Sequence, residues 1–204
     1  MTAGPARAGR LPGPIIETVV TTRDHEGRVN FAAMGVVWAP DHLVIRPYLR
    51  TRTYRNLAAT RCAVVNVTDD VLVFVKSALS RETFAWDQAR SVPGAVLRDA
   101  CHWSEVVVQA GVDGPPGGEG RAEVPVRVVG RGFGRPFLGL CRAQHAVVEA
   151  SIVASRLGWL PADEVDRDLI RLQTLVDRTG GEREREAMGY VLARVQAVRA
   201  RAAG

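Results

Sequence analysis

Apolar and polar residues follow two different patterns along the chain, one typical of strands and a later one typical of helices. Short runs rich in Val, Ile and Thr, bounded by Gly, Pro or Asp, favour strands. Such runs predict strands at residues 15–22, 29–37, 43–47, 62–67, 95–100, 103–110 and 121–129. The first two are expected to pair as a hairpin across the turn at 24–27, although a turn of this length permits other pairings. The glycine-rich segment 111–120 is expected to be a loop.

Helical spacing of apolar residues dominates the last third of the chain. It predicts helices at 137–157, 162–179 and 182–201. Gly158 and the pair at 180–181 are expected to end the first two, and Pro161 to be the first residue of the second. A shorter helix is expected at 52–60. The apolar run 71–79 fits a strand or a helix, because its length does not decide between them.

A run of strands followed by a run of helices indicates an α+β fold built on an antiparallel sheet or barrel. We therefore expect a flexible N-terminal arm at 1–14, a β-rich body at 15–130 and a helical segment at 131–204 packed on it. A chain of 204 residues with 47% hydrophobic content is long enough and apolar enough to bury one sizeable core.

The cysteines and the absence of long apolar segments indicate where in the cell the protein is expected. Cys62, Cys101 and Cys141 are odd in number and far apart, which is typical of free thiols in a reducing environment. No stretch is apolar for long enough to cross a bilayer, and residues 1–14 do not resemble a secretion signal. We expect a cytoplasmic protein without membrane contact.

The net charge of +5 and the pI near 9.7 raise the question of nucleic-acid binding. However, 26 of the 27 basic residues are arginine and Lys76 is the one lysine, a bias typical of genome composition. The arginines are interleaved with acids, as in 182–186, and no nucleic-acid-binding motif is present. Nucleic-acid binding is therefore the least favoured of three hypotheses.

The segment 43–56, LVIRPYLRTRTYRN, carries the clearest functional signal. An apolar strand leads to Arg46 and Pro47, and proline ends strand pairing because it has no N–H. A turn rich in guanidinium and hydroxyl groups then precedes the short helix, whose N-cap is Thr51 or Thr53. Backbone N–H groups, hydroxyls and planar cations suit a phosphate. The alternative is an arginine-rich helix start that faces solvent.

Other catalytic and metal-binding patterns are weak. The serines lack a glycine-flanked nucleophile turn, and the four histidines never fall at metal-ligand spacing, so we expect no metal. The segment 130–134, GRGFG, lies between a predicted strand and a predicted helix but lacks the full dinucleotide-binding spacing. Asp69 and Asp70 fit a metal or a turn after a strand, and the turn is favoured. Reactivity, if present, would come from a cofactor.

Several motifs in order, IIETVVTT, GRVNFAAMGV, LVIRPYLRTRTYRNL, CAVVNVTDD, LRDACHWSEV and RAQHAVVEASIVASRL, resemble an uncharacterised family of split-barrel flavoproteins, a domain of unknown function. That family lies within the flavin-reductase-like and pyridoxamine-phosphate-oxidase-like group, whose members bind FMN as homodimers. The resemblance covers roughly residues 15–188. It implies an antiparallel split β-barrel with C-terminal helices and FMN at a dimer interface.

The resemblance also implies roles for individual residues. The family's phosphate-binding run matches Arg46, Thr51, Arg52, Thr53 and Asn56. The strand along the flavin ring matches residues 30–36, which places Asn30 and the backbone groups of Ala32, Ala33, Met34 and Gly35 beside the isoalloxazine. A glycine lets a planar ring come close, although it could equally be an ordinary strand glycine.

Four further residues have a structural and a functional interpretation. Asn66 either touches the cofactor or holds the turn that follows it, with structure slightly favoured. Arg142 and Glu149 lie seven positions apart on one helix, where a structural ion pair is favoured over a place in the interface or the pocket wall. Trp103 is a core residue by default and a ring-stacking residue only by a weak argument.

Two hypotheses remain ahead of nucleic-acid binding. The first is an FMN-dependent oxidoreductase, a homodimer acting on a small molecule, for which the resemblance suggests a link to tetrahydromethanopterin-dependent one-carbon metabolism. The second is a non-catalytic flavin- or small-molecule-binding dimer of the same fold. No proton-transfer residue stands out near the phosphate-binding segment, which favours the second.

Overall fold

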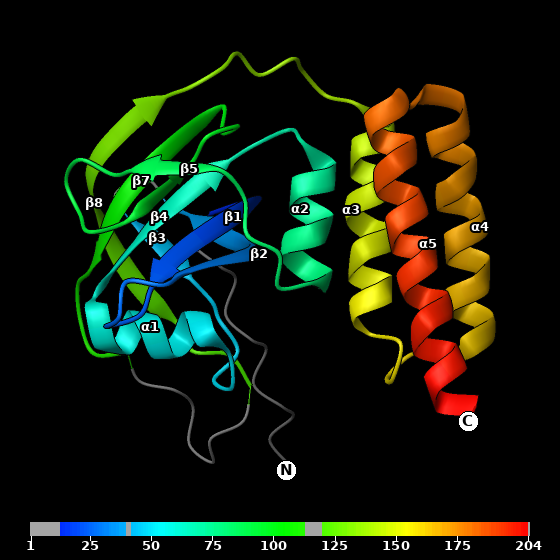
Figure 1. Cartoon of the computed structure of the whole chain (residues 1–204), viewed down its shortest axis with the longest axis horizontal. Helices are drawn as coiled ribbons and strands as arrows, with labels where there is room; N and C mark the ends of the chain where they lie inside the picture. The colour runs from blue at the N-terminus through cyan, green and yellow to red at the C-terminus, as the bar shows by residue number, and fades with distance from the viewer. Residues whose placement is uncertain (1–12, 40–41, 113–119, 204) are drawn as a thin grey trace, which may run out of the picture.

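The computed structural model describes residues 13–39, 42–112 and 120–203, and its first layer is a β-barrel (Figure 1). Six strands close the barrel in the order β1-β2-β3-β8-β7-β4, and every neighbouring pair is antiparallel. They are β1 (Ile15–Arg23), β2 (Val29–Trp38), β3 (Leu43–Ile45), β4 (Cys62–Val67), β7 (His102–Val108) and β8 (Val124–Phe133). Alternate aliphatic residues such as Val20, Val36 and Val65 fill the interior. The antiparallel α+β prediction is confirmed, including the β1–β2 hairpin.

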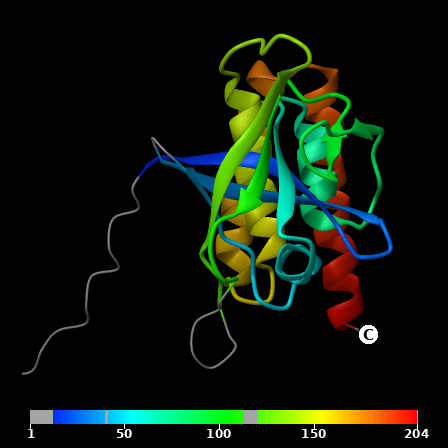
Figure 2. The same cartoon turned by 90° about the vertical axis from the view of Figure 1, so that its left-hand side faces the viewer.

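The second layer is a set of helices beside the barrel (Figures 1 and 2). It contains α3 (Arg142–Ser155), α4 (Ala162–Thr179) and α5 (Glu182–Ala203). Helix α2 (Val71–Leu79) lies between these helices and the barrel. None of the helices in the described part of the chain is long and apolar enough to span a lipid bilayer. Likewise, no three His, Cys, Asp or Glu side chains among the described residues gather as a metal site requires.

The apolar run 71–79, which fits a strand or a helix by sequence, forms the helix α2. The position of α2 explains why the sequence alone does not decide. Val71, Leu72 and Val75 pack on α3, α4 and α5. Val73 and Phe74 pack on the barrel side with residues of β1 and β2. A helix that is buried on two faces shows no amphipathic period, so its sequence looks like that of a buried strand.

Predictions near the end of the barrel need correction. The segment 130–134 does not lie between a strand and a helix, because β8 continues to Phe133. Its glycines are explained by packing. An ideal Cβ on Gly132 would lie 2.0 Å from the ring of Trp103 on the neighbouring strand, so the indole lies over a position without a side chain. Trp103 is therefore partly buried against β8, as expected of a core residue.

The helix predicted at 137–157 is shorter than expected, because α3 begins at Arg142 and ends at Ser155. Leu138 and Leu140 are 86% and 87% exposed, so the apolar residues that extended the predicted pattern do not face the core. The short strand β5 (Trp86–Gln88), which pairs with β6 (Ala95–Leu97), was not predicted, because it is exposed along its length. Pro161 stands one residue before α4 as its N-cap.

Two adjacent aspartates join the barrel to the helices. Asp69, which follows β4, accepts hydrogen bonds from the Arg135 guanidinium and from the N–H of Leu138 (3.1 Å). Asp70 caps α2 by accepting from the N–H groups of Leu72 and Val73, and it pairs with Arg183 of α5 at 2.7 Å. Asp69 and Asp70 therefore have the structural role that the sequence favours.

The environment of Asp69 favours its ionised form. Burial opposes ionisation, but the hydrogen bonds from Arg135 and from the Leu138 N–H outweigh it and lower the pKa of Asp69. Because the native pKa lies below the unfolded value, the ionised carboxylate stabilises the fold above about pH 4. This contribution is lost as the pH falls through the native pKa.

We predict that Asp69→Asn lowers the free energy of unfolding by about 1–3 kcal/mol at pH 7, because it leaves the hydrogen-bond donors of Arg135 and Leu138 poorly matched. Urea unfolding of both proteins at pH 7 and at pH 3–4 measures this effect, and the difference should shrink at the lower pH. Asp166→Asn is the control, since the exposed pair with Arg199 should contribute less than about 1 kcal/mol. Equal losses in the two variants would contradict the prediction.

Candidate functional site

The edge of β2 that faces away from β1 is largely without a strand partner. β2 pairs with β1 from Val29 to Val37, but with β3 only from Val36 to Trp38. β3 ends at Ile45, two residues before Pro47, which has no N–H to continue the ladder. In antiparallel strands alternate residues direct their N–H and C=O groups to each side. On 30–35, the groups directed away from β1 therefore have no ladder partner among the described strands.

Helix α1 (Arg52–Thr60) lies beside the N-terminal end of this edge. Thr51 is its N-cap and accepts from the N–H of Tyr54 at 3.3 Å, which decides between the two predicted caps. The amide nitrogen of Asn30 donates to the hydroxyl of Thr53 at 3.2 Å and so joins β2 to α1. Asn56 donates to Thr22 of β1 at 3.0 Å. These bonds hold the start of the helix against the barrel.

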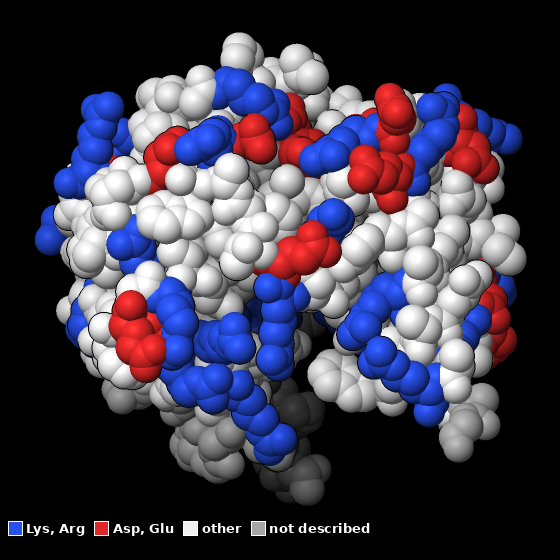
Figure 3. Space-filling model, viewed as in Figure 1, with Lys and Arg blue, Asp and Glu red and all other residues white. Residues whose placement is uncertain are grey.

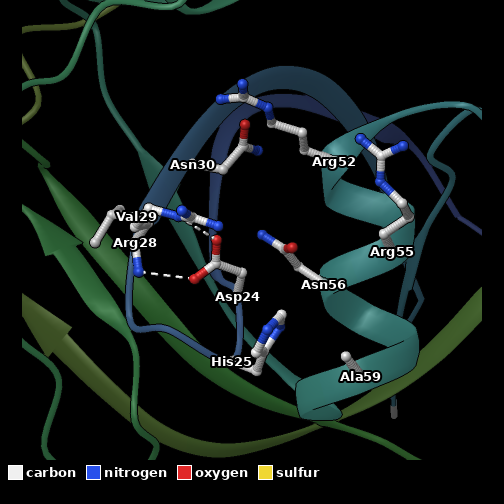
Figure 4. A pocket seen from close by; sticks show the side chains of 9 residues that line it. All are labelled: Asp24, His25, Arg28, Val29, Asn30, Arg52, Arg55, Asn56 and Ala59. Atoms are coloured by element: carbon white, nitrogen blue, oxygen red, sulfur yellow. Dashed lines mark hydrogen bonds and ion pairs between the residues drawn. The ribbon is translucent and has the colours of Figure 1, made fainter.

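A cavity of about 610 Å³ opens between α1 and the β1–β2 turn (Figure 4). Its lining combines cationic, amide and small apolar side chains: Asp24, His25, Arg28, Val29, Asn30, Arg52, Arg55, Asn56 and Ala59. Figure 4 shows Arg52 extending from α1 toward Asn30, while Asn56 points from the same helix into the middle of the cavity. Asn30, Arg52 and Asn56, which the resemblance assigns to FMN binding, therefore line one cavity.

The cationic groups of the cavity differ in how far they are neutralised. Arg28 pairs with Asp24 at 2.7 Å and with Glu26 at 2.5 Å. The hydrogen bond from Arg28 lowers the pKa of Asp24, so this carboxylate stays ionised at neutral pH. The side chains of Arg52 and Arg55, in contrast, have no hydrogen bond or ion pair within the described residues.

The helix end adds to this positive charge. The first turn of α1 contains no acidic residue to balance its exposed N–H groups. Basic side chains also gather on the lower part of the barrel face, over α1 and the neighbouring turn (Figure 3). The site is therefore suited to an anion.

The predicted phosphate-binding residue Arg46 lies apart from the cavity. Because Ile45 pairs with Val36, the register carries Arg46 to the level of Gly35. Its Nε atom lies 3.4 Å from a carboxylate oxygen of Glu123. The predicted residues thus follow one line along β2, with Arg46 and Gly35 at one end and Arg52, Thr53 and Asn56 at the other.

Gly35 is explained by packing within the barrel wall. An ideal Cβ at this position would lie 2.3 Å from Cγ2 of Ile15 and 3.3 Å from Oε1 of Glu17, both on β1. The glycine is therefore needed for the approach of β1, whether or not a ring also approaches. Ala32, Ala33 and Met34 continue the strand from there toward Asn30 and are partly exposed.

Asn66 is fully buried, and its amide group is occupied by the barrel. It donates to the carbonyl of Val19 at 2.9 Å and accepts from the N–H of Leu97 at 2.9 Å. This agrees with the structural interpretation of the residue. Arg142 and Glu149 form no ion pair within the described structure, because seven residues of helix separate them by about 10 Å.

Three residues were not among the individually predicted binding residues. Arg28 and Arg55 line the cavity, and Arg55 belongs to the guanidinium-rich segment 43–56 that carries the functional signal. Glu17 faces Gly35 through the β1–β2 register, which a motif does not reveal. Desolvation and the nearby Glu149 carboxylate raise the pKa of Glu17, and Arg121 opposes this.

Comparison with known proteins identifies the class of fold and then the family. The structure resembles a putative flavin reductase with a split-barrel domain from Shewanella frigidimarina (TM-score 0.50, 13% identity, 57% of this chain and 66% of that chain). It also resembles nitrilotriacetate monooxygenase component B from Bacillus cereus (TM-score 0.52, 19% identity, 67% and 87% covered). These similarities confirm the predicted split barrel.

The family follows from the sequence itself. Residues 16–131 match the N-terminal domain, and residues 141–193 a second domain, of the family described as protein of unknown function (DUF447). The chain belongs to this family, as the resemblance implied. An FMN-bound protein of the same family from Methanosarcina mazei shares the fold with a TM-score of 0.77 and 20% identity, over 90% of this chain and 96% of that chain.

We predict that Glu17→Gln raises the melting temperature slightly at neutral pH, by about 1–2 °C. The effect is small because the side chain as a whole is exposed and solvent screens its charge, although the neighbouring strand partly desolvates the carboxylate. Because the native pKa of Glu17 lies above its unfolded value, its ionised form destabilises the fold, and this cost appears as the pH rises through the native pKa. Melting curves from pH 4 to pH 8 measure the difference, which should vanish near pH 4. A constant difference across that range would refute the raised pKa.

Proposed function

We propose that the chain binds FMN along β2 and the start of α1, and acts as a flavin-dependent oxidoreductase on a small molecule. The observation that carries the proposal is the continuity of two features, the unpaired edge of β2 and the basic cavity beside it. The FMN-bound member of the same family from Methanosarcina mazei supports the choice of cofactor.

The residues present fit the two chemically different parts of FMN. A planar ring with hydrogen-bonding edges suits the backbone groups of 32–35, which lack a strand partner on one side. A phosphate monoester carries up to two negative charges near neutral pH, and the unneutralised Arg52 and the first turn of α1 provide matching donors. In this arrangement Asn30, Thr53 and Asn56 position the helix and the strand around the phosphate.

When bound, FMN would supply the electron-transfer chemistry, and the chain would supply binding and orientation. The β2 backbone would fix the ring, and Arg52 would fix the phosphate end. Arg46, at the level of Gly35, would lie near the ring end of the site. The proposed substrate is a small molecule. A link to tetrahydromethanopterin-dependent metabolism rests on the family resemblance alone.

The alternative is a non-catalytic flavin- or small-molecule-binding dimer of the same fold. One observation favours it: the titratable side chains of the cavity other than arginine are Asp24, tied to Arg28, and His25. The side chain of His25 is 79% exposed and lies 3.7 Å from the carboxylate of Glu26. Steady oxidation of NADH or NADPH by the FMN-loaded protein would exclude this alternative.

We also propose a homodimer, with FMN at its interface as the resemblance implies. Four large apolar side chains from the last residue of β8 to the residues before α3 are exposed, namely Phe133 (85%), Phe137 (53%), Leu138 (86%) and Leu140 (87%). The hydrogen bond from the Leu138 N–H to Asp69 holds this segment in place. An apolar surface held in this way is typical of a protein–protein contact.

The three free cysteines agree with a reducing, cytoplasmic location.

We predict that Arg52→Gln weakens FMN binding by about 10- to 100-fold, the effect of losing a hydrogen bond between charged groups. Riboflavin, which has no phosphate, should bind the parent protein more weakly than FMN and should be indifferent to the substitution. Fluorescence titration of flavin measures both affinities.

Arg185→Gln, which removes the same charge from the exposed side of α5, is the matched control and should leave FMN affinity unchanged. Equal affinities for FMN and riboflavin would overturn the proposed phosphate site. A colourless protein that cannot be reconstituted with FMN would overturn the proposed function as a whole.

We predict that the double variant Leu138→Glu, Leu140→Glu is a monomer, because charges at two highly exposed apolar positions oppose burial in an interface. Light scattering coupled to gel filtration measures the mass. Ile170→Glu, an exposed apolar position on α4, is the control and should remain dimeric. A monomeric parent protein would contradict the proposal directly.

A further inference from the structure

Glu17 of β1 is a carboxylate without a partner at the ring end of the proposed site. It forms no hydrogen bond and no ion pair within the described residues, and the charges that act on it are those of Glu149 on α3 and of Arg121. Partial burial and the Glu149 carboxylate raise the pKa of Glu17, whereas Arg121 opposes them. A charge that the fold holds at a loss of stability is typical of functional sites.

The register of β1 and β2 places this carboxylate beside the edge along which the ring is proposed to lie. Glu17 pairs with Gly35, and its Oε1 atom lies 3.3 Å from the ideal Cβ position of that glycine. A group that is hydrogen-bonded to the free edge of β2 takes the place of a neighbouring strand, which lies about 4.8 Å away. The carboxylate of Glu17 is thus within roughly 6–8 Å of a flavin ring bound at Gly35.

Two arginines at this end of the site are engaged by other partners. Arg46 lies on the opposite side of β2 from Glu17, and its Nε atom is 3.4 Å from Glu123. The Arg121 guanidinium lies 4.4 Å from the ring centroid of Tyr48 and donates to its hydroxyl at 3.1 Å. Neither arginine forms an ion pair with Glu17 within the described structure, so Glu17 retains its own charge when it is ionised.

An ionised carboxylate near a flavin ring opposes reduction of the ring, because the added electrons bring negative charge. A protonated carboxyl group is neutral and has no such effect. Charges near the ring are one means by which a protein tunes a flavin. At an effective dielectric constant near 20, two charges 6–8 Å apart interact strongly enough to change an equilibrium roughly tenfold or more.

We propose that Glu17 tunes the electron affinity of bound FMN, lowering it when the carboxylate is ionised and leaving it unchanged when the carboxyl group is protonated. This inference rests on the proposed function, because it takes the ring to lie along β2 at Gly35. It assigns an effect on the cofactor to a residue that does not line the cavity. The electron affinity then depends on pH through Glu17, in addition to the pH dependence of the flavin itself.

The test is a spectroelectrochemical titration of the FMN-loaded protein between pH 4 and pH 8. We expect Glu17→Gln to raise the ratio of the affinities for reduced and oxidised FMN about tenfold at pH 8, which is about 30 mV in reduction potential for a two-electron couple. The difference should disappear as the pH falls through the native pKa of Glu17, because the protonated acid is as neutral as the amide.

Two further variants separate this effect from a general change in charge. Asp166→Asn removes an exposed carboxylate from α4 and is the matched control, which should have the parent potential at every pH. Glu149→Gln removes the carboxylate that raises the pKa of Glu17, so the effect of Glu17 should begin at a lower pH. That effect is the difference in potential between Glu149→Gln and the double variant Glu17→Gln, Glu149→Gln.

The results that would overturn the inference differ from those that would overturn the proposed function. A Glu17→Gln variant with the parent potential at pH 8, or with a difference that does not change with pH, refutes the role of Glu17. Equal weakening of oxidised and reduced FMN binding would show a structural role and refute it too. If FMN binding still depends on Arg52, the proposed function stands in each of these cases. A protein that binds no FMN would overturn both.

Discussion

The hydrogen-bond ladder between β2 and β3 stops after three residue pairs, and the candidate site depends on this early end. Pro47 cannot donate to the ladder, so the chain leaves the barrel and enters α1 five residues later. The edge of β2 is left without a strand partner over the same stretch. One proline-containing turn therefore creates both an edge that can bind a planar group and a helix start that can bind an anion.

The same turn brings its binding groups together by short-range bonds. Thr51 caps the helix, and Asn30 and Asn56 tie it to β2 and β1. The result is a cavity whose wall contains two arginines that no described carboxylate neutralises. A site with net positive charge and satisfied amide groups is prepared for an anionic ligand, because little reorganisation is needed when the ligand arrives.

Features encoded locally were predictable from the sequence, and those encoded by register were not. The bounds of α4 and the hairpin of β1 and β2 follow from neighbouring residues and are found as expected, and the N-cap of α1 is Thr51, one of the two predicted caps. The contact of Glu17 with Gly35 depends on strand pairing across eighteen positions. The exposed Leu138 and Leu140 fit a helical pattern, but they lie before the start of α3, and the N–H of Leu138 is bound by Asp69. Such a long-range bond leaves no periodic signal.

The placement of α2 has a consequence for how this molecule unfolds. Its apolar side chains contribute to two cores at once, one shared with α3, α4 and α5 and one shared with β1 and β2. The two segments that match separate family models are thus thermodynamically coupled through a helix that belongs to the first of them. Removing residues 141–193 would uncover Val71, Leu72 and Val75, so the barrel and the helices are expected to melt in a single cooperative transition.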